Sequence, residues 1–119
     1  MKKHNILRDI VFLPKRFSEG NTSMYSLLKE SGYFELHNQI SEVDILEVLN
    51  ENLECINQWL NLSEDKRSSS GWYFKQNDNG KFVVGYYPSD GNFQLYEYND
   101  ELEACAVFIK QEIDDIRNS

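Results

Sequence analysis

The side chains that most often carry out chemistry are few in this sequence. His4 and His37 are its two histidines, and Cys55 and Cys105 are its two cysteines. A metal site needs several His, Cys or carboxylate ligands at convergent spacings, such as paired CxxC or HxxxH motifs, and none is present. The sequence also lacks a nucleophile elbow, a P-loop and a dinucleotide fingerprint. We therefore expect a protein that is not an enzyme and that uses no metal or cofactor.

Carboxylates at helical spacing are the second group that could do chemistry. They are Glu42, Asp44, Glu47, Glu51 and Glu54. Paired carboxylates act as general acid and base when an apolar environment raises the pKa of one of them. These five belong to a helix face without an apolar wall, so we interpret them as a solvated acidic face. The segment "NDNG" (77–80) lacks the span and the closing Glu of a calcium loop, and we interpret it as a hairpin turn.

Tyrosines gather in "GYYPSDGNFQLYEY" (85–98), a stretch without Lys, Arg or His. Proteins that bind single-stranded nucleic acid also use aromatic sheet faces, but they combine them with a basic groove. Only Lys75 and Lys81 are near this aromatic surface. Two interpretations remain open. The tyrosines line a second core covered by the N-terminal segment, or they form a protein interface, where Tyr supplies rigid contact area.

Charge favours a protein partner over nucleic acid. The formal net charge is −8, and residues 30–65 contain nine acids and no Lys or Arg. From residue 90 to the end, eight acids stand against Lys110 and Arg117. Phosphate backbones are repelled by such surfaces, whereas a basic protein is attracted to them. We expect no direct nucleic-acid binding. An alternative interpretation of the acidic charge is that it only keeps the protein soluble.

The sequence predicts neither export nor membrane insertion. It has no apolar run long enough to span a bilayer, and the N-terminal "MKKHNILRDIVFLPKRF" has no small-residue cleavage site. Cys55 and Cys105 both fall in apolar helical patterns, so we expect buried, reduced thiols rather than a disulfide. These features indicate a cytoplasmic location.

Helix signals divide the chain. A short helix is predicted from Thr22 or Ser23 to Lys29, with Gly32 as its C-cap, and "IVFLPKRF" (10–17) is expected to be extended because Pro14 interrupts it. A capping box at Ser41 and Asp44, with Ile40 and Ile45 as a hydrophobic staple, starts a long helix. Its predicted apolar stripe is Ile45, Leu49, Leu53, Ile56 and Leu60. The last helix (100–117) begins at Asp100, with Glu103 completing a box, and its stripe is Leu102, Cys105, Ile109, Ile113 and Ile116.

Three strands are predicted between these helices, at 71–76, 81–87 and 92–98. A three-residue turn with Gly80 left-handed pairs residue 74 with residue 84. A two-residue turn at Asp90-Gly91 pairs residue 86 with residue 95. This register places Phe93 and Leu95 on the core face and leaves an outer face of Tyr73, Lys75, Val83, Tyr87, Gln94, Tyr96 and Tyr98.

The predicted fold is an α+β two-layer domain in the order α-α-β-β-β-α, with a three-stranded antiparallel meander packed against helices. We expect residues 1–119 to form a single domain. Its parts are a mainly helical half (1–62), a linker loop (63–71), the meander (72–98) and the C-terminal helix (100–117).

The C-terminal half of the chain resembles immunity proteins of bacterial polymorphic-toxin systems. The resemblance lies in the stretch "WLNLSEDKRSSSGWYFKQNDNGKFVVGYYPSDG", followed by "LYEYNDELEACAVFIKQEI". The likeness is greatest to the CdiI proteins of contact-dependent growth inhibition, and it covers about half of the chain, from Trp59 to Ile113. Immunity proteins do not share one fold. The resemblance implies a non-enzymatic inhibitor that binds the toxic domain of its cognate effector, often a nuclease, in the cytoplasm of the producing cell, at the active site or at an exosite.

A toxin-binding surface can therefore be predicted. Apolar anchors would be Tyr87, Tyr96 and Tyr98, and the carboxylates of Asp90, Glu97, Asp100 and Glu101 would face basic side chains of the toxin. The acidic helix face of Glu47, Glu51 and Glu54 is a second candidate surface. A small acidic adaptor or regulatory domain that binds another protein would have the same features. The identity of the toxin and the oligomeric state stay open.

Overall fold

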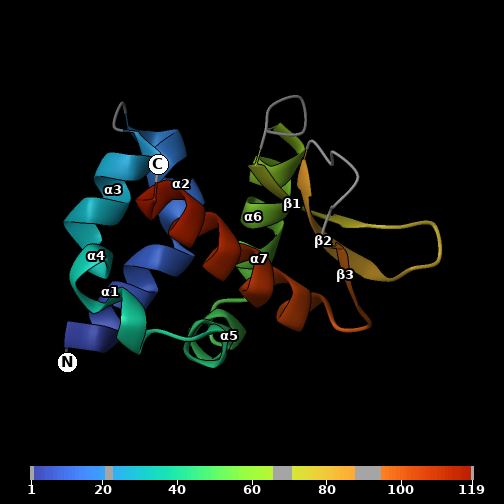
Figure 1. The fold of residues 1–119 in the computed structure, drawn as a ribbon, viewed down its shortest axis with the longest axis horizontal. Coiled ribbons are helices and arrows are strands. Elements are labelled where there is room, and N and C mark those ends of the chain that lie inside the picture. The colour runs from blue at the N-terminus through green and yellow to red at the C-terminus, as the bar shows by residue number, and fades with distance from the viewer. Residues whose placement is uncertain (1, 21–22, 66–70, 88–94, 119) are drawn as a thin grey trace.

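The computed structural model describes residues 2–20, 23–65, 71–87 and 95–118. These residues form an α+β fold in which helices precede a three-stranded antiparallel sheet and a long helix follows it (Figure 1). The helices before the sheet are α1 (Lys2–Val11), α2 (Leu13–Glu19), α3 (Met24–Ser31), α4 (Tyr33–Leu36), the 3-10 helix η1 (His37–Gln39), α5 (Glu42–Asn50) and α6 (Glu54–Asp65). The sheet consists of β1 (Gly71–Gln76), β2 (Phe82–Tyr87) and β3 (Leu95–Tyr98), and α7 (Glu101–Arg117) follows.

The α+β class is confirmed, but the predicted order α-α-β-β-β-α has too few helices before the sheet. The segment 10–17, expected to be extended, is helical in α1 and α2. Pro14 lies in the first turn of α2. Backbone N–H groups in a first turn have no acceptor within the helix, so proline, which lacks this group, is tolerated there. Ile6, Leu7, Ile10 and Val11 of α1 are buried, so packing of one apolar face holds this segment in place.

The predicted helix caps are confirmed. Ser23 accepts a hydrogen bond from the Ser26 backbone N–H at the start of α3, and Gly32 ends that helix with φ of 94°. At the start of α5, Ser41 and Asp44 exchange the two hydrogen bonds of a capping box. Asp100 caps α7 by accepting from the Leu102 backbone N–H. These bonds join residues two or three positions apart, so local sequence suffices to predict them.

The long helix predicted from residue 42 to 60 is two helices. α5 ends at Asn50 and α6 begins at Glu54. The Asn52 side chain donates to the Val48 carbonyl (2.9 Å), and the Asn52 backbone N–H donates to the Leu49 carbonyl (2.9 Å). These bonds close the last turn of α5. Leu53, which the helical stripe placed in the core, is instead 55% exposed.

The first hairpin has the predicted register. Phe74 pairs with Val84, and Gly80 is left-handed with φ of 81°. The predicted linker (63–71) overlaps both neighbouring elements, because α6 continues to Asp65 and β1 begins at Gly71.

The register predicted between β2 and β3 is wrong by one residue. Leu95 pairs with Gly85 instead of residue 86, and Tyr96 and Tyr98 pair with Val84 and Phe82. Because side chains alternate between the two faces of a sheet, this shift moves both tyrosines to the face that packs on the helices. The same shift turns Glu97 to the outer face, which avoids placing a carboxylate against the core. The predicted turn at Asp90-Gly91 and Phe93 lie outside the described residues.

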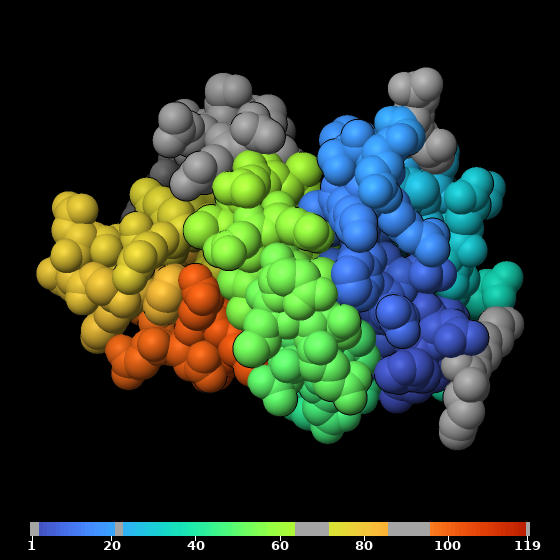
Figure 2. Space-filling model, turned by 180° about the vertical axis from the view of Figure 1, so that it is seen from behind, coloured from blue at the N-terminus to red at the C-terminus, as the bar shows by residue number. Residues whose placement is uncertain are grey.

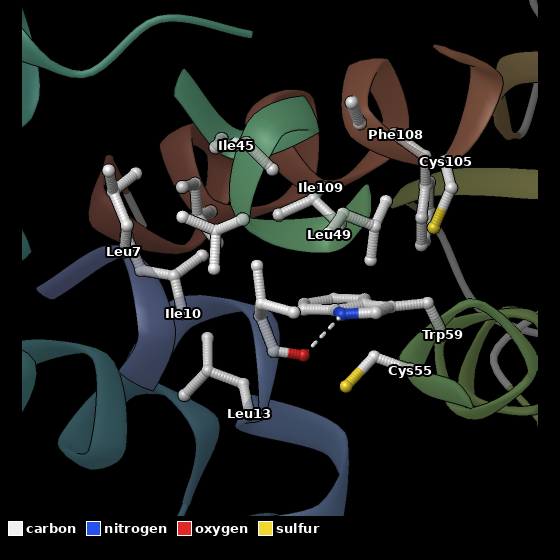
Figure 3. Packing of buried hydrophobic residues seen from close by; sticks show 14 of the residues in the cluster. Leu7, Ile10, Leu13, Ile45, Leu49, Cys55, Trp59, Cys105, Phe108 and Ile109 are labelled. Atoms are coloured by element: carbon white, nitrogen blue, oxygen red, sulfur yellow. Dashed lines mark hydrogen bonds between the residues drawn. The ribbon is translucent and has the colours of Figure 1, made fainter. Parts of the chain in front are cut away.

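Helix α7 packs against all three strands and also against α3, α5 and α6. Figure 1 shows it crossing the molecule between the N-terminal helices and the sheet. Its residues 104–109 are all buried. Phe108 stacks on Phe74 of β1 (5.8 Å between ring centroids) and meets Trp59 of α6 edge-to-face (5.9 Å). The Trp59 indole N–H donates to the Val11 carbonyl at the end of α1 (2.9 Å; Figure 3).

Helix α6 also closes the outer edge of β1. The Phe74 backbone N–H points away from β2 and donates to the hydroxyl oxygen of Ser63 (2.6 Å). Ser63 is 2% exposed, so water does not replace this bond. The hydroxyl therefore satisfies a buried donor that an edge strand would otherwise leave unpaired.

Replacing Ser63 with Ala should destabilise the fold. The substitution leaves the buried Phe74 N–H without an acceptor, and we expect a loss of about 1–3 kcal/mol in the free energy of unfolding. Urea denaturation followed by circular dichroism measures this loss. Ser18→Ala is the control, because the Ser18 hydroxyl is exposed and donates to the Lys15 carbonyl within one helix. Equal stability of the Ser63 variant and the parent would contradict the role given to this bond.

Candidate functional site

One edge of the molecule combines carboxylates and tyrosines from three elements. We call it the tyrosine edge and define it by Glu42 of α5, Tyr96 and Tyr98 of β3, and Glu103 of α7. Both carboxylate residues and Tyr96 are exposed, and Tyr98 is half-buried against the core cluster. Tyr98 and Tyr96 reach this edge because the β3 register turns them toward the helices, where α5 and α7 both begin.

The environment of Tyr98 shows how these groups act on one another. Burial raises the pKa of Tyr98, and the negative charges of Glu42 and Glu103 raise it further, as does Tyr96. Within the described residues, no positive charge offsets them at this phenol. The tyrosine edge is therefore an aromatic surface in a negative field, which suits contact with cationic side chains.

The carboxylates of the tyrosine edge occupy the first turns of α5 and α7, where negative charge is stabilised. Glu42 and Asp44 lie in the first turn of α5, and Glu101 and Glu103 in the first turn of α7. The positive end of a helix dipole stabilises negative charge there. The box predicted for α7 does not form in the described residues, since Asp100 caps the helix without a return bond from Glu103. The Glu103 carboxylate therefore remains on the surface.

The remaining residues predicted for the sheet surface are divided among different places. Asp100 caps α7, and Glu101 follows it at the helix start. Glu97 lies on the opposite face of the sheet, where its carboxylate accepts a hydrogen bond from the Asn77 side chain (3.2 Å). Tyr87 pairs with Gly71 at the end of β2. Asp90 lies outside the described residues.

The described N-terminal segment, residues 2–20, does not cover the outer face of the sheet. α1 and α2 pack on α3, α5 and α6 instead, on the far side of the molecule from the meander (Figure 1). On this outer face the Tyr73 ring crosses Gly85 so closely that a Cβ at Gly85 would lie 2.5 Å from the Tyr73 hydroxyl. A larger residue at position 85 would therefore force the Tyr73 ring to move.

The acidic helix face is also split, since α5 and α6 are separate. Glu47 and Glu51 lie beside α1, at the end of α5, and Glu54 begins α6. Asp44 forms an ion pair with Lys3 of α1 (3.1 Å). The five carboxylates at 42–54 therefore do not form one continuous surface.

A partly buried polar cluster joins α4 to α7. The Tyr33 hydroxyl donates to the Asp114 carboxylate, and Lys110 donates to the Tyr33 oxygen (2.7 Å) and lies 3.3 Å from Asp114. Burial and the Asp114 carboxylate raise the pKa of Tyr33, which keeps the phenol protonated. A protonated phenol is a poor base and a poor nucleophile. We therefore interpret the cluster as structural, because its bonds connect α4 to α7. His37 contributes its backbone carbonyl to Lys110 (3.3 Å).

Cys55 and Cys105 are both buried and reduced, as predicted (Figure 3). Burial raises the pKa of Cys55 to about 11, and it raises the pKa of Cys105 further still. Thiols of this kind are inert because the thiolate is the reactive form. In the part of the chain that the structure describes, no group of three His, Cys, Asp or Glu residues is placed to hold a metal ion.

Sequence reasoning missed two members of the tyrosine edge, Glu42 and Glu103. Glu42 was interpreted as part of a solvated acidic face and Glu103 as part of a capping box, and the two residues are 61 positions apart in the chain. A signal did exist, because both fall in the first turn of a predicted helix. Only the packing of α5 beside α7 shows that these two turns meet at β3.

Comparison of the chain with protein-family models, curated protein sequences and solved structures finds no match. Within the described residues, no helix combines the length and apolarity needed to cross a bilayer.

Removing the carboxylates of the tyrosine edge should lower the pKa of Tyr98. We expect Glu42→Gln with Glu103→Gln to shift the pKa of Tyr98 toward its ordinary value, because both negative charges raise it in the parent. The measurement is an NMR titration of the tyrosine ring carbons. Glu97→Gln on the opposite face is the control and should leave this pKa unchanged.

Alkaline pH should weaken the fold through Cys55. Its pKa in the folded state is about 11, against 9.0 for an ordinary thiol. Between these values the unfolded chain ionises while the folded chain does not, so the free energy of unfolding should fall as pH rises from 9 to 11. Urea titrations at several pH values measure the slope. Cys55→Ala should reduce the slope, and an unchanged slope would show that other groups cause it.

Proposed function

We propose that this protein is an immunity protein that binds a basic toxin domain and occludes it. The observation that carries the proposal is the tyrosine edge, where carboxylates from the starts of two helices surround tyrosines of a third element. The net charge of −8 supports it as well. The sequence resemblance to immunity proteins of polymorphic-toxin systems points to the same role.

The two kinds of side chain would contribute differently to binding. Tyr96 and Tyr98 offer rigid aromatic area, which often supplies the anchoring contacts of an interface. Glu42, Glu101 and Glu103 would attract Lys and Arg side chains of the toxin and increase the rate of encounter. A nuclease toxin fits this chemistry, because a nuclease needs basic groups to hold its anionic substrate.

The same surface disfavours nucleic acid as the direct ligand. Phosphates need Lys or Arg, and the charges of the described residues that act on Tyr98 are negative. Inhibition would therefore occur by covering the toxin rather than by protecting its nucleic-acid target. A basic active-site cleft is the surface of such a toxin that complements the tyrosine edge best.

Co-production with the toxin domain encoded beside its own gene tests this function. We expect cells that make both proteins to survive and the two proteins to copurify. Survival should be lost with Tyr96→Ala and Tyr98→Ala together, because truncating an anchor typically costs about 2 kcal/mol or more of binding energy. Binding is measured by surface plasmon resonance, and circular dichroism verifies that the variant is folded.

Charge reversals separate the candidate surfaces from one another. Glu103→Lys should slow association with the toxin and weaken its salt dependence, whereas Glu97→Lys on the opposite sheet face should not. Glu30→Lys on α3 is a control far from both surfaces. Absence of rescue by the parent protein would contradict the immunity function and favour an acidic adaptor. Rescue with equal association rates for all three variants would remove the tyrosine edge as the contact surface.

A further inference from the structure

A separate groove runs between α1 and α5, with a volume of about 310 Å³. Its floor includes Leu7 of α1 and Val48 of α5, and Lys3 and His4 form the α1 rim. The α5 rim carries Asp44, Glu47 and Glu51. Figure 2 shows the surfaces of these two helices side by side on the face opposite to that in Figure 1.

The charges of this groove are unbalanced. Lys3 is paired with Asp44 (3.1 Å). Neither Glu47 nor Glu51 forms an ion pair within the described residues, and both are exposed. They lie one helical turn apart, so their side chains are neighbours on the helix surface. Among the described residues, two carboxylates without an ion-pair partner therefore stand beside an apolar floor, with His4 on the facing rim.

The groove is distinct from the tyrosine edge. Glu42 acts on Tyr98 beside β3 and α7, whereas Glu47 and Glu51 border α1. The 100° rotation per residue of an α-helix puts Glu42 on a different flank of α5 from Asp44 and Glu51. One helix thus presents carboxylates to two separate surfaces.

We propose that the groove binds an arginine side chain of a protein partner. The aliphatic stem of arginine would lie over Leu7 and Val48, as long cationic side chains do when they cover apolar surface. The planar guanidinium has five donors and can bridge two carboxylates, whereas an ammonium is a point charge. Glu47 and Glu51 supply that pair of acceptors.

A second copy of this chain fits the groove poorly, since the protein carries a net charge of −8 and copies repel one another. A basic partner is attracted to the groove. The identification of that partner as a toxin rests on the proposed function, but the chemistry of the groove does not. Arginine recognition can therefore be tested without a toxin.

NMR titration of the full chain with N-acetyl-arginine methylamide tests the inference. We expect saturable shifts of the Leu7 and Val48 methyl signals. The citrulline analogue is the matched probe, because it has almost the same shape and no charge, and it should cause no such shifts. Glu47→Gln with Glu51→Gln should weaken arginine binding about tenfold, since each exposed ion pair contributes modestly.

Glu30→Gln with Glu54→Gln is the charge-matched control and should leave binding unchanged, because neither residue lines the groove. Equal shifts with citrulline, equal weakening by the control pair, or no shift at Leu7 and Val48 would each overturn the inference. The two proposals fail separately. Absence of toxin rescue contradicts the immunity function while leaving arginine binding intact, and absence of arginine binding leaves rescue through the tyrosine edge intact.

Discussion

The aromatic contacts of Trp59, Phe108 and Phe74 join the two parts of this fold. Trp59 bonds to the carbonyl that ends α1, and its ring meets Phe108 of α7, which in turn stacks on Phe74 of the sheet. All three rings are fully buried. Because α7 contacts both the N-terminal helices and the strands, its position sets where the start of α7 lies relative to α5 and β3. The tyrosine edge depends on that position.

Both the stability of the fold and the proposed function favour acidic residues at the starts of α5 and α7. Acidic residues in a first helical turn are stabilised by the helix dipole. Glu42 and Glu103 satisfy this preference, and both also contribute to the negative field around Tyr98. An acidic binding surface built from helix starts therefore costs the fold less than the same charges elsewhere. Stabilisation of these carboxylates by the two helix dipoles explains how a charged surface can lie beside a half-buried tyrosine.

The distribution of basic residues limits where a cationic partner can bind. Residues 1–29 contain six of the twelve Lys and Arg residues of the chain. In the part of the chain that the structure describes, Lys3 pairs with Asp44 and Arg16 pairs with Asp9. Exposed carboxylates remain at Glu42 and Glu103 beside β3 and at Glu47 and Glu51 toward the end of α5. Both proposed contacts, the tyrosine edge and the α1–α5 groove, lie in these regions.

Features that depend on a few neighbouring residues could be predicted from the sequence. The cap at Ser41, the left-handed glycines and the first hairpin register belong to this group, because hydrogen bonds and backbone sterics over two to five residues determine them. The face presented by Tyr96 and Tyr98 could not be predicted in this way. A shift of one residue in β3 reverses that face, and burial of Tyr98 with Glu97 turned outward selects the register. Long-range packing alone likewise places Glu42 and Glu103 at the same edge and packs α1 against α5. No local interaction links segments so far apart in the chain.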